Sequence, residues 1–229
     1  MRAAALYSGG KDSTYAAYLA TRKDSLECLV TLSPRREDSY MFHYPNVWAT
    51  RLQAEAMRVP HILIETEGIK ETELQDLIKA LTLAKERYRI EGLYTGALAS
   101  VYQKSRIDRI CDELALESIS PLWHIDPETH LRNLLKNGFR VIVTSVSALG
   151  FNEGWLGRVI DEKAVEELLD LNSKYGVHAG LEGGEGETLV LDCPIFTKQV
   201  EVQEYEKHWR GDAGYLEITK ARLVPKEES

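Results

Sequence analysis

Three kinds of segment are absent from this 229-residue sequence. It has no run of about 18 consecutive apolar residues, so we expect no helix that spans a bilayer. Its N-terminus has neither a long apolar stretch nor a small-residue cleavage site, and secretion is therefore not expected. Its three cysteines, Cys28, Cys111 and Cys193, form no CxxC pair. We expect buried thiols in a cytoplasmic protein, because reducing compartments keep cysteines unpaired.

Basic residues are fewer than acidic residues. The sequence has 28 Lys and Arg residues against 36 Asp and Glu residues, which gives a net charge of −8. Such a chain is not expected to bind nucleic acid or an anionic membrane through its overall charge. With 44% hydrophobic residues, the chain is long enough to form one large core or two smaller ones.

The first half of the sequence alternates between strand-like and helical patterns. Strands are predicted over Ala3–Tyr7, Leu26–Leu32, His61–Glu65, Gly92–Ala97 and Ser118–Trp123. Helices are predicted between them over Asp12–Arg22, Val47–Arg58, Glu71–Arg89 and Gln103–Leu116. This alternation is typical of βαβ units. It predicts an α/β domain over residues 1–124, with a doubly wound five-stranded parallel sheet.

The pattern changes after Asp126-Pro127. A helix up to Asn137-Gly138 is followed by a predicted strand over Arg140–Val146 and a helix over Asp161–Tyr175, in which we expect Tyr175 to pack in the core. Strand-like segments then follow one another closely, over Leu189–Phe196, Gln199–Tyr205 and Tyr215–Leu223. Strands without intervening helices predict a second, smaller α+β domain over residues 125–229.

The hexapeptide SGGKDS follows the first predicted strand and opens the first predicted helix. Gly9 and Gly10 permit positive φ angles and a close approach of the backbone to a ligand, while the helix N-terminus and Lys11 attract an anion. Asp12 fits such a site only if a hard cation such as Mg²⁺ accompanies the anion. A tight turn with an N-cap would also contain glycines, but the ordered hexapeptide favours a site for Mg²⁺-bound polyphosphate. It is neither GxxxxGK[ST] nor GxGxxG.

A second glycine-rich motif, GLEGGEGETLVLD, lies in the second half of the chain. It places Glu182, Glu185 and Glu187 among four glycines and ahead of an apolar strand. Carboxylates near a polyphosphate would repel it unless they bind a cation or face a positively charged substrate. A solvated acidic hairpin turn is the alternative interpretation.

Four further side chains are candidates for substrate contacts. His43 and Asn46 follow the second predicted strand, in a loop at the carboxyl edge of the sheet. Gln103 and Arg106 lie three residues apart at the start of a predicted helix, where they share a face and can hold a carboxylate or phosphate. The alternatives are a surface histidine and simple capping of the helix. Trp123, just before the domain junction, is expected to pack in the core or at an interface.

SGGKDS resembles the pyrophosphate loop of the N-type ATP pyrophosphatases, which belong to the adenine nucleotide α-hydrolase superfamily. Members of that group adenylate a carbonyl oxygen, release pyrophosphate and let a nucleophile displace AMP. Further stretches narrow the resemblance: MFHYPN (41–46), TGALASVYQKSRIDRICDELAL (95–116), SPLW (120–123) and EGGEGETLVLDCPIF (182–196). In this order, and over nearly the whole chain, they resemble the diphthine–ammonia ligase family.

This resemblance implies an ATP-dependent amide ligase. Its substrates would be ammonium and diphthine, the modified histidine of translation elongation factor 2. ATP would be held by Ser8, Gly9, Gly10, Lys11, Asp12 and Ser13, with Mg²⁺ at Asp12. Lys11 and Asp12 would act in catalysis, and Glu185 or Glu187 would take a proton from ammonium. Substrate contacts would come from His43, Asn46, Gln103, Arg106 and Glu182. No glutaminase domain is visible, so free ammonium is the expected nitrogen source.

Two other functions fit the same loop. One is a tRNA-modifying enzyme that performs thiolation or lysidine formation, although thiolation usually needs paired cysteines and an acidic chain disfavours tRNA. The other is a nucleotide-binding module without chemistry, although binding of adenosine alone requires neither Lys11 nor Asp12. Product analysis is the discriminator. AMP with pyrophosphate indicates ligase chemistry, ADP with phosphate indicates another ATPase, and tight ATP binding without turnover supports the nucleotide-binding module.

Overall fold

The structure is a computed structural model that describes residues 1–34, 46–66 and 70–226. The chain divides into two compact units. The first comprises Met1–Ser8 and Asp12–Trp123, and the second comprises Gly9–Lys11 and His124–Ser229. None of the described helices is long and apolar enough to cross a membrane.

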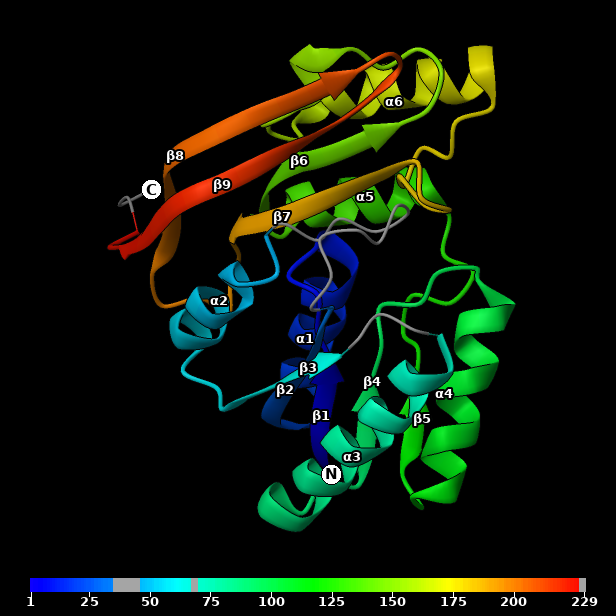
Figure 1. Cartoon of the computed structure of the whole chain (residues 1–229), viewed down its shortest axis with the longest axis vertical. Helices are drawn as coiled ribbons and strands as arrows, with labels where there is room; N and C mark the ends of the chain where they lie inside the picture. Colours follow the sequence, from blue (N-terminus) through cyan, green and yellow to red (C-terminus); the bar gives the residue numbers. More distant parts are fainter. Residues whose placement is uncertain (35–45, 67–69, 227–229) are drawn as a thin grey trace. The chain divides into compact units, whose positions relative to one another are not determined.

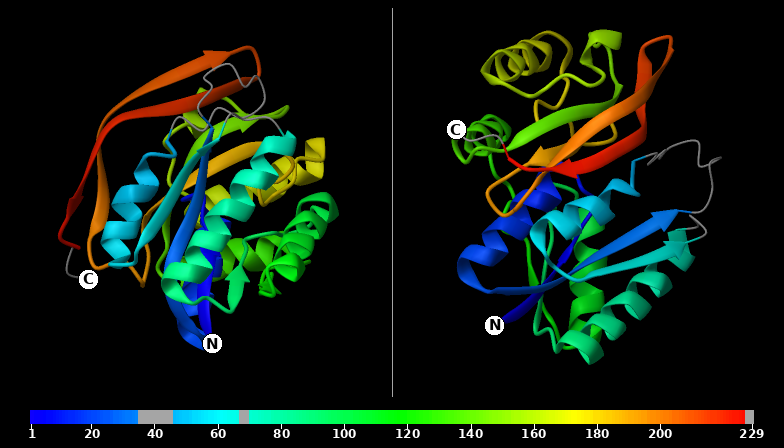
Figure 2. Two further views of the ribbon diagram at one scale, coloured as in Figure 1. Left: turned by 60° about the horizontal axis from the view of Figure 1, so that its bottom comes forward. Right: turned by 90° about the vertical axis from the view of Figure 1, so that its left-hand side faces the viewer.

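The first unit contains a five-stranded parallel sheet with the strand order β3-β2-β1-β4-β5 (Figure 1). Its strands are β1 (Arg2–Leu6), β2 (Ser25–Pro34), β3 (His61–Thr66), β4 (Gly92–Tyr94) and β5 (Glu117–Ile119). The helices that connect them are α1 (Lys11–Lys23), α2 (Ala49–Met57), α3 (Lys70–Tyr88) and α4 (Val101–Glu113). Helices lie on both faces of the sheet (Figure 2). The predicted doubly wound parallel sheet is confirmed.

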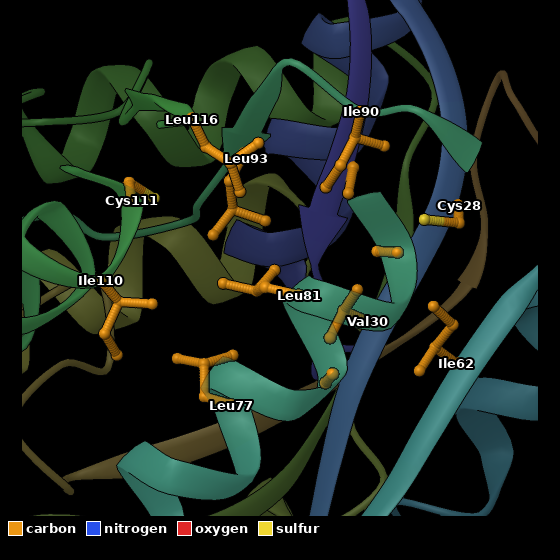
Figure 3. Packing of buried hydrophobic residues seen from close by; sticks show 13 residues of the cluster. Cys28, Val30, Ile62, Leu77, Leu81, Ile90, Leu93, Ile110, Cys111 and Leu116 are labelled. Carbon is orange, nitrogen blue, oxygen red and sulfur yellow. The ribbon is translucent and has the colours of Figure 1, made fainter. Parts of the chain in front are cut away.

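The core of the first unit forms where α3 and α4 pack on one face of this sheet. Leu77 and Leu81 of α3 belong to the same buried cluster as Val30 of β2 and Leu93 of β4 (Figure 3). Fully buried side chains of this kind each contribute about 1.5–3 kcal/mol relative to an exposed position. On the central strand β1, the small residues 3–5 are all alanines and all fully buried, which leaves room for helices against both faces of the sheet.

All three cysteines are free thiols and buried, as expected. Cys28 and Cys111 belong to the core cluster of the first unit. Burial disfavours a thiolate, and it raises the pKa of Cys28 to about 12 and that of Cys111 to about 11. These side chains therefore act as small apolar residues rather than as nucleophiles.

The second unit contains a four-stranded antiparallel sheet with the order β7-β6-β9-β8. Its elements are α5 (Pro127–Lys136), β6 (Arg140–Ser147), the 3₁₀ helix η1 (Glu153–Trp155), α6 (Glu162–Tyr175), β7 (Gly186–Asp192), β8 (Gln199–Arg210) and β9 (Ala213–Val224). The long β8–β9 hairpin is drawn in orange and red in Figure 1. The predicted α+β class of this part of the chain is confirmed, and β8 extends five residues beyond its predicted end at Tyr205.

Aspartate side chains cap the N-termini of the helices α5 and α6 in the second unit, and a glycine ends α6. The side chain of Asp126 accepts a hydrogen bond from Thr129 N at 2.8 Å at the start of α5, and a proline occupies the first turn. Asp161 caps α6 in the same way, with Ala164 N at 2.7 Å. Gly176 ends α6 with a φ of 74°, a left-handed conformation that glycine adopts without strain.

The prediction that Tyr175 packs in the core is wrong. Helical periodicity places it seven residues after the buried Leu168, on the same face of α6. Tyr175 is nevertheless 51% exposed, because it is the last residue of the helix and the buried positions lie in the earlier turns. Its ring lies beside Gly150, where a Cβ atom would come within 2.7 Å of it.

A buried polar chain links three strands of the first unit. His61 Nε2 lies 2.8 Å from Thr31 Oγ1, and Thr31 Oγ1 donates a hydrogen bond to Tyr7 O at 2.7 Å. The hydroxyl therefore accepts from the imidazole. Burial is the main cause that lowers the pKa of His61 to about 4, so the ring is neutral near pH 7.

We predict that His61 contributes to acid sensitivity. Below its ordinary pKa of 6.5 the unfolded chain takes up a proton that the folded chain takes up only near pH 4. The contribution of the neutral His61 to stability is therefore complete above pH 6.5 and is lost as the pH drops, by about 1–2 kcal/mol at pH 4.5 once solvent screening of this partly exposed ring is allowed for. His61→Gln keeps a donor for Thr31 without titrating, and it should lose correspondingly less between the two pH values. Denaturant unfolding at pH 7 and 4.5 measures this, and equal losses would contradict a neutral His61.

Candidate functional site

The order of the strands places a topological switch point between β1 and β4 of the first sheet. From β1 the chain adds β2 and β3 on one side, and it then crosses to place β4 on the other side of β1 (Figure 1). At such a switch point the loops after the two neighbouring strands diverge, and doubly wound sheets bind ligands there. The loops after β1 and β4 contain, respectively, the motif SGGKDS and the segment Thr95–Ser100.

The loop after β1 has the backbone geometry that its glycines predict. Gly9 has a φ of 84°, and α1 begins two residues later at Lys11. Ser8 N donates to Ser13 Oγ at 3.2 Å, and the hydroxyl oxygens of Ser8 and Ser13 lie 3.0 Å apart. The structure thus brings the two serines together across the start of α1, where helix N–H groups and the helix dipole favour an anion.

Gly96 is a site residue that the sequence analysis did not single out. A Cβ atom at this position would lie 2.6 Å from Asp12 C and 2.6 Å from Ser13 N. Only a residue without a side chain therefore lets the loop after β4 lie against the start of α1. The available signal was a glycine within two residues of the end of an apolar strand, inside TGALAS.

Lys11 and Gly9 are hydrogen-bonded within the second unit. Lys11 N donates to Thr188 Oγ1 at 3.1 Å, and Val190 N donates to Gly9 O at 3.0 Å. The Lys11 side chain is buried, with 2% of its surface exposed. A buried ammonium group costs free energy unless an anionic or polar partner compensates it.

The acidic loop before β7 is held in place by Glu185. Its carboxylate accepts a hydrogen bond from His178 N, and its backbone carbonyl accepts one from Ser147 N at 2.8 Å. Leu181 N closes the turn onto His178 O at 2.8 Å, and Leu181 is buried with a φ of 58°. A leucine in the left-handed region is strained, and the surrounding hydrogen bonds maintain that conformation.

The other two glutamates of this motif differ from Glu185. Glu187, the second residue of β7, pairs across the sheet with Ser145. Burial raises the pKa of Glu187 to about 7, which makes its carboxylate able to accept a proton near neutral pH. Glu182 is half-buried, and its carbonyl accepts from Glu185 N at 3.3 Å.

The remaining candidates belong to the first unit. His43 lies outside the described residues, whereas Asn46 is buried and its carbonyl accepts from Ala49 N at 2.9 Å at the start of α2. Gln103 is exposed, and its N–H is capped by Ser100 Oγ at 3.3 Å. The guanidinium of Arg106 lies 3.8 Å from the ring centre of Tyr102. Substrate contacts by these residues remain predictions.

We predict that Gly96→Ala destabilises the protein by about 1–3 kcal/mol. The added methyl group meets backbone atoms of α1, which cannot rotate away as a side chain can, and overpacking of this kind typically has this cost. Ala99→Ser is the matched control, since Ala99 is an exposed residue of the same loop. Urea unfolding of both variants measures the effect. A Gly96→Ala variant as stable as Ala99→Ser would show that the loop and helix do not require this close approach.

Comparisons with known proteins agree over both halves of the chain. Residues 1–118 match the family model of the diphthamide synthase N-terminal domain, and residues 126–224 match that of the diphthamide synthase C-terminal domain. The chain is 34% identical to the diphthine–ammonia ligase of Mus musculus, over 97% of this chain and 91% of that protein. It is also 34% identical to the Homo sapiens enzyme, over 90% of this chain and 84% of that one.

Two further comparisons have lower sequence identity. The diphthine–ammonia ligase of Schizosaccharomyces pombe is 30% identical and matches the whole chain, which covers 43% of that longer protein. A solved structure, that of a predicted subunit of tRNA methyltransferase from Methanocaldococcus jannaschii, is 16% identical with a TM-score of 0.44, over 85% of this chain and 98% of that one. Both family domains match this chain, and the identity to its relatives extends over most of its length. This chain therefore belongs to the diphthamide synthase family and is a ligase.

Proposed function

We propose that this protein amidates diphthine on translation elongation factor 2, using ATP and ammonium and releasing AMP and pyrophosphate. The observation that carries the proposal is the match of both family domains, with identity over most of the chain to relatives named for this reaction. The motif SGGKDS supports ATP as the second substrate, because it lies at the switch point of the sheet and opens α1.

The residues of the loop fit a triphosphate. The left-handed Gly9 turns the chain directly from β1 into α1, so the first N–H groups of the helix follow closely on the end of the strand. In this proposal, backbone N–H groups of Gly9, Gly10 and Lys11 hold the departing pyrophosphate, and the hydroxyls of Ser8 and Ser13 assist. Lys11 adds positive charge where negative charge develops.

Asp12 fits a magnesium ion that accompanies the nucleotide. Its half-buried carboxylate stands in the first turn of α1, and carboxylate oxygens are ligands that Mg²⁺ prefers. Such an ion would neutralise part of the charge on the phosphates. Without it, a carboxylate beside a triphosphate would be repelled.

The proposed reaction has two halves. The carboxylate of diphthine attacks the α-phosphorus of ATP, so that a C–O–P bond forms, the α–β bond breaks and pyrophosphate leaves. Ammonia then attacks the acyl carbon of this adenylate and AMP leaves with the bonding electrons. The attacking nitrogen loses a proton, for which we propose Glu185 or Glu187 as the acceptor. Glu187 is the better suited of the two, because its pKa is raised to about 7 and Glu185 already accepts His178 N.

The direct test uses purified protein with diphthine-bearing elongation factor 2, ATP and ammonium. We expect diphthamide in the elongation factor by mass spectrometry, with AMP and pyrophosphate in equal amounts. Formation of ADP and phosphate would contradict the proposed chemistry. ATP binding without turnover would favour a nucleotide-binding module.

Our prediction for the loop is that Lys11→Ala and Asp12→Ala each lower the rate of AMP release about 100-fold or more. Each removes one preorganised charge contact to ATP or its magnesium ion, and a loss of this kind typically raises the barrier by about 3–4 kcal/mol. Lys23→Ala, in the last turn of the same helix and exposed, is the matched control and should keep its activity. Steady-state AMP release measures all three. Near-normal release by a variant that lacks both Lys11 and Asp12 would rule out a pyrophosphate loop.

A further prediction separates the two halves of the reaction. Glu187→Gln should bind ATP and form the adenylate in a single turnover, yet form little amide. More ammonium or a higher pH should partly restore the amide, because both supply free ammonia without a protein base. Quenched samples that follow adenylate and amide separately measure this, with Glu185→Gln examined in parallel. If both variants lose adenylate as severely as amide, these acids serve the ATP site instead.

The stability of the Glu187→Gln variant is the control for this experiment. Because burial raises the pKa of Glu187, its charge weakens the fold at pH values above about 7, and that cost is absent once the group is protonated below about 4.5. Glu187→Gln should therefore be at least as stable as the wild type at pH 8. A loss of amide formation in a variant of undiminished stability is a defect in chemistry rather than in folding.

A further inference from the structure

Strands β8 and β9 form a long hairpin (Figures 1 and 2). At two positions an acidic residue of β8 lies opposite a basic residue of β9. Glu201 lies opposite Arg222, whose Nε donates to its carboxylate at 2.7 Å. Glu204 lies opposite Lys220, whose Nζ is 3.0 Å from its carboxylate. Opposite charges in directly paired positions stabilise a hairpin, and like charges destabilise it.

The next acidic position breaks this rule. Glu206 lies directly opposite Glu217, so two carboxylates face each other across the strands. Among the described residues, the ion pairs recorded for both carboxylates are with His208. Its Nε2 lies 2.9 Å from Glu217 Oε2 and 3.9 Å from Glu206 Oε2. An imidazole thus takes the place that Arg222 and Lys220 take elsewhere on the hairpin.

The three side chains have the spacing of a cation site. Their ligand atoms all lie within 4.8 Å of one another. A cation with bonds of about 2.1 Å holds its ligands about 3–4 Å apart, and the two distances from His208 Nε2 fall close to that range. The imidazole is also oriented in advance, because it stacks on Tyr215 with ring centres 4.5 Å apart and planes 17° apart.

We propose that Glu206, His208 and Glu217 bind a divalent transition-metal ion of the Zn²⁺ type. One imidazole and two carboxylates suit such an ion better than Mg²⁺, which is usually bound through oxygen alone. The ion would neutralise part of the charge of the two facing carboxylates. It would connect β8 to β9 close to their turn at Gly211, as the salt bridges do further along the hairpin.

The test is isothermal titration of the full-length protein with Zn²⁺ alone, without nucleotide or protein substrate. We expect one saturable site that His208→Gln and Glu217→Gln each weaken about 10-fold or more, since even the loss of a group that supports a metal ligand costs this much. Binding should also weaken as the pH falls, because protons compete with a metal ion for imidazole and carboxylate ligands in general. Bound Zn²⁺ should raise the melting temperature of the wild type but not that of Glu217→Gln.

Two matched controls make the result specific. Glu204→Gln changes an acid on the same strand, and His124→Ala removes an exposed histidine elsewhere in the second unit. Both should bind Zn²⁺ as the wild type does. The proposal is overturned if the wild type has no saturable site, if His208→Gln or Glu217→Gln binds as tightly as the wild type, or if either control loses the site. Because no catalytic residue is altered, its failure would leave the proposed amidation untouched.

Discussion

The contact that the first unit depends on is the close approach of Gly96 to the backbone of α1. It joins the loops of the two strands, β1 and β4, between which the chain changes direction in the sheet. Any side chain at position 96 would force the helix start away from the edge of β4. In the loop after β1, the left-handed Gly9 turns the chain directly from strand into helix. Together the two glycines set the position of the start of α1 relative to the ends of β1 and β4.

Carboxylates in the second unit occupy three distinct environments. Glu185 is a structural acceptor that fixes the turn before β7, and Glu187 is desolvated enough for its pKa to rise to about 7. Glu206 and Glu217 are more exposed, and they face each other across a hairpin that elsewhere pairs acid with base. The same side chain thus holds a loop, has a pKa near neutrality, or faces another acid across a hairpin, according to its surroundings.

Much of the fold was predictable from the sequence, and the failures have a common cause. The alternation of strands and helices and the parallel sheet follow from local hydrophobic periodicity, and the burial of the cysteines was expected from their number and spacing. Periodicity misled for Tyr175, because it reports which face of a helix is apolar and not where the neighbouring core ends. Periodicity also predicted an end of β8 at Tyr205, whereas the strand continues to Arg210. The part of the hairpin near its turn is largely exposed, and its backbone hydrogen bonds need no apolar alternation.

The sequence by itself determined the α/β class, the order of elements and the position of the hexapeptide SGGKDS at the end of the first strand. These depend on residues that are neighbours in the chain, so their physics is local. Only the tertiary structure distinguished Glu185 from Glu187, revealed the contact of Gly96 with α1, and placed Glu206 opposite Glu217. Each of these depends on desolvation, van der Waals contact or charge between segments distant in sequence, and such interactions exist only once the chain has folded.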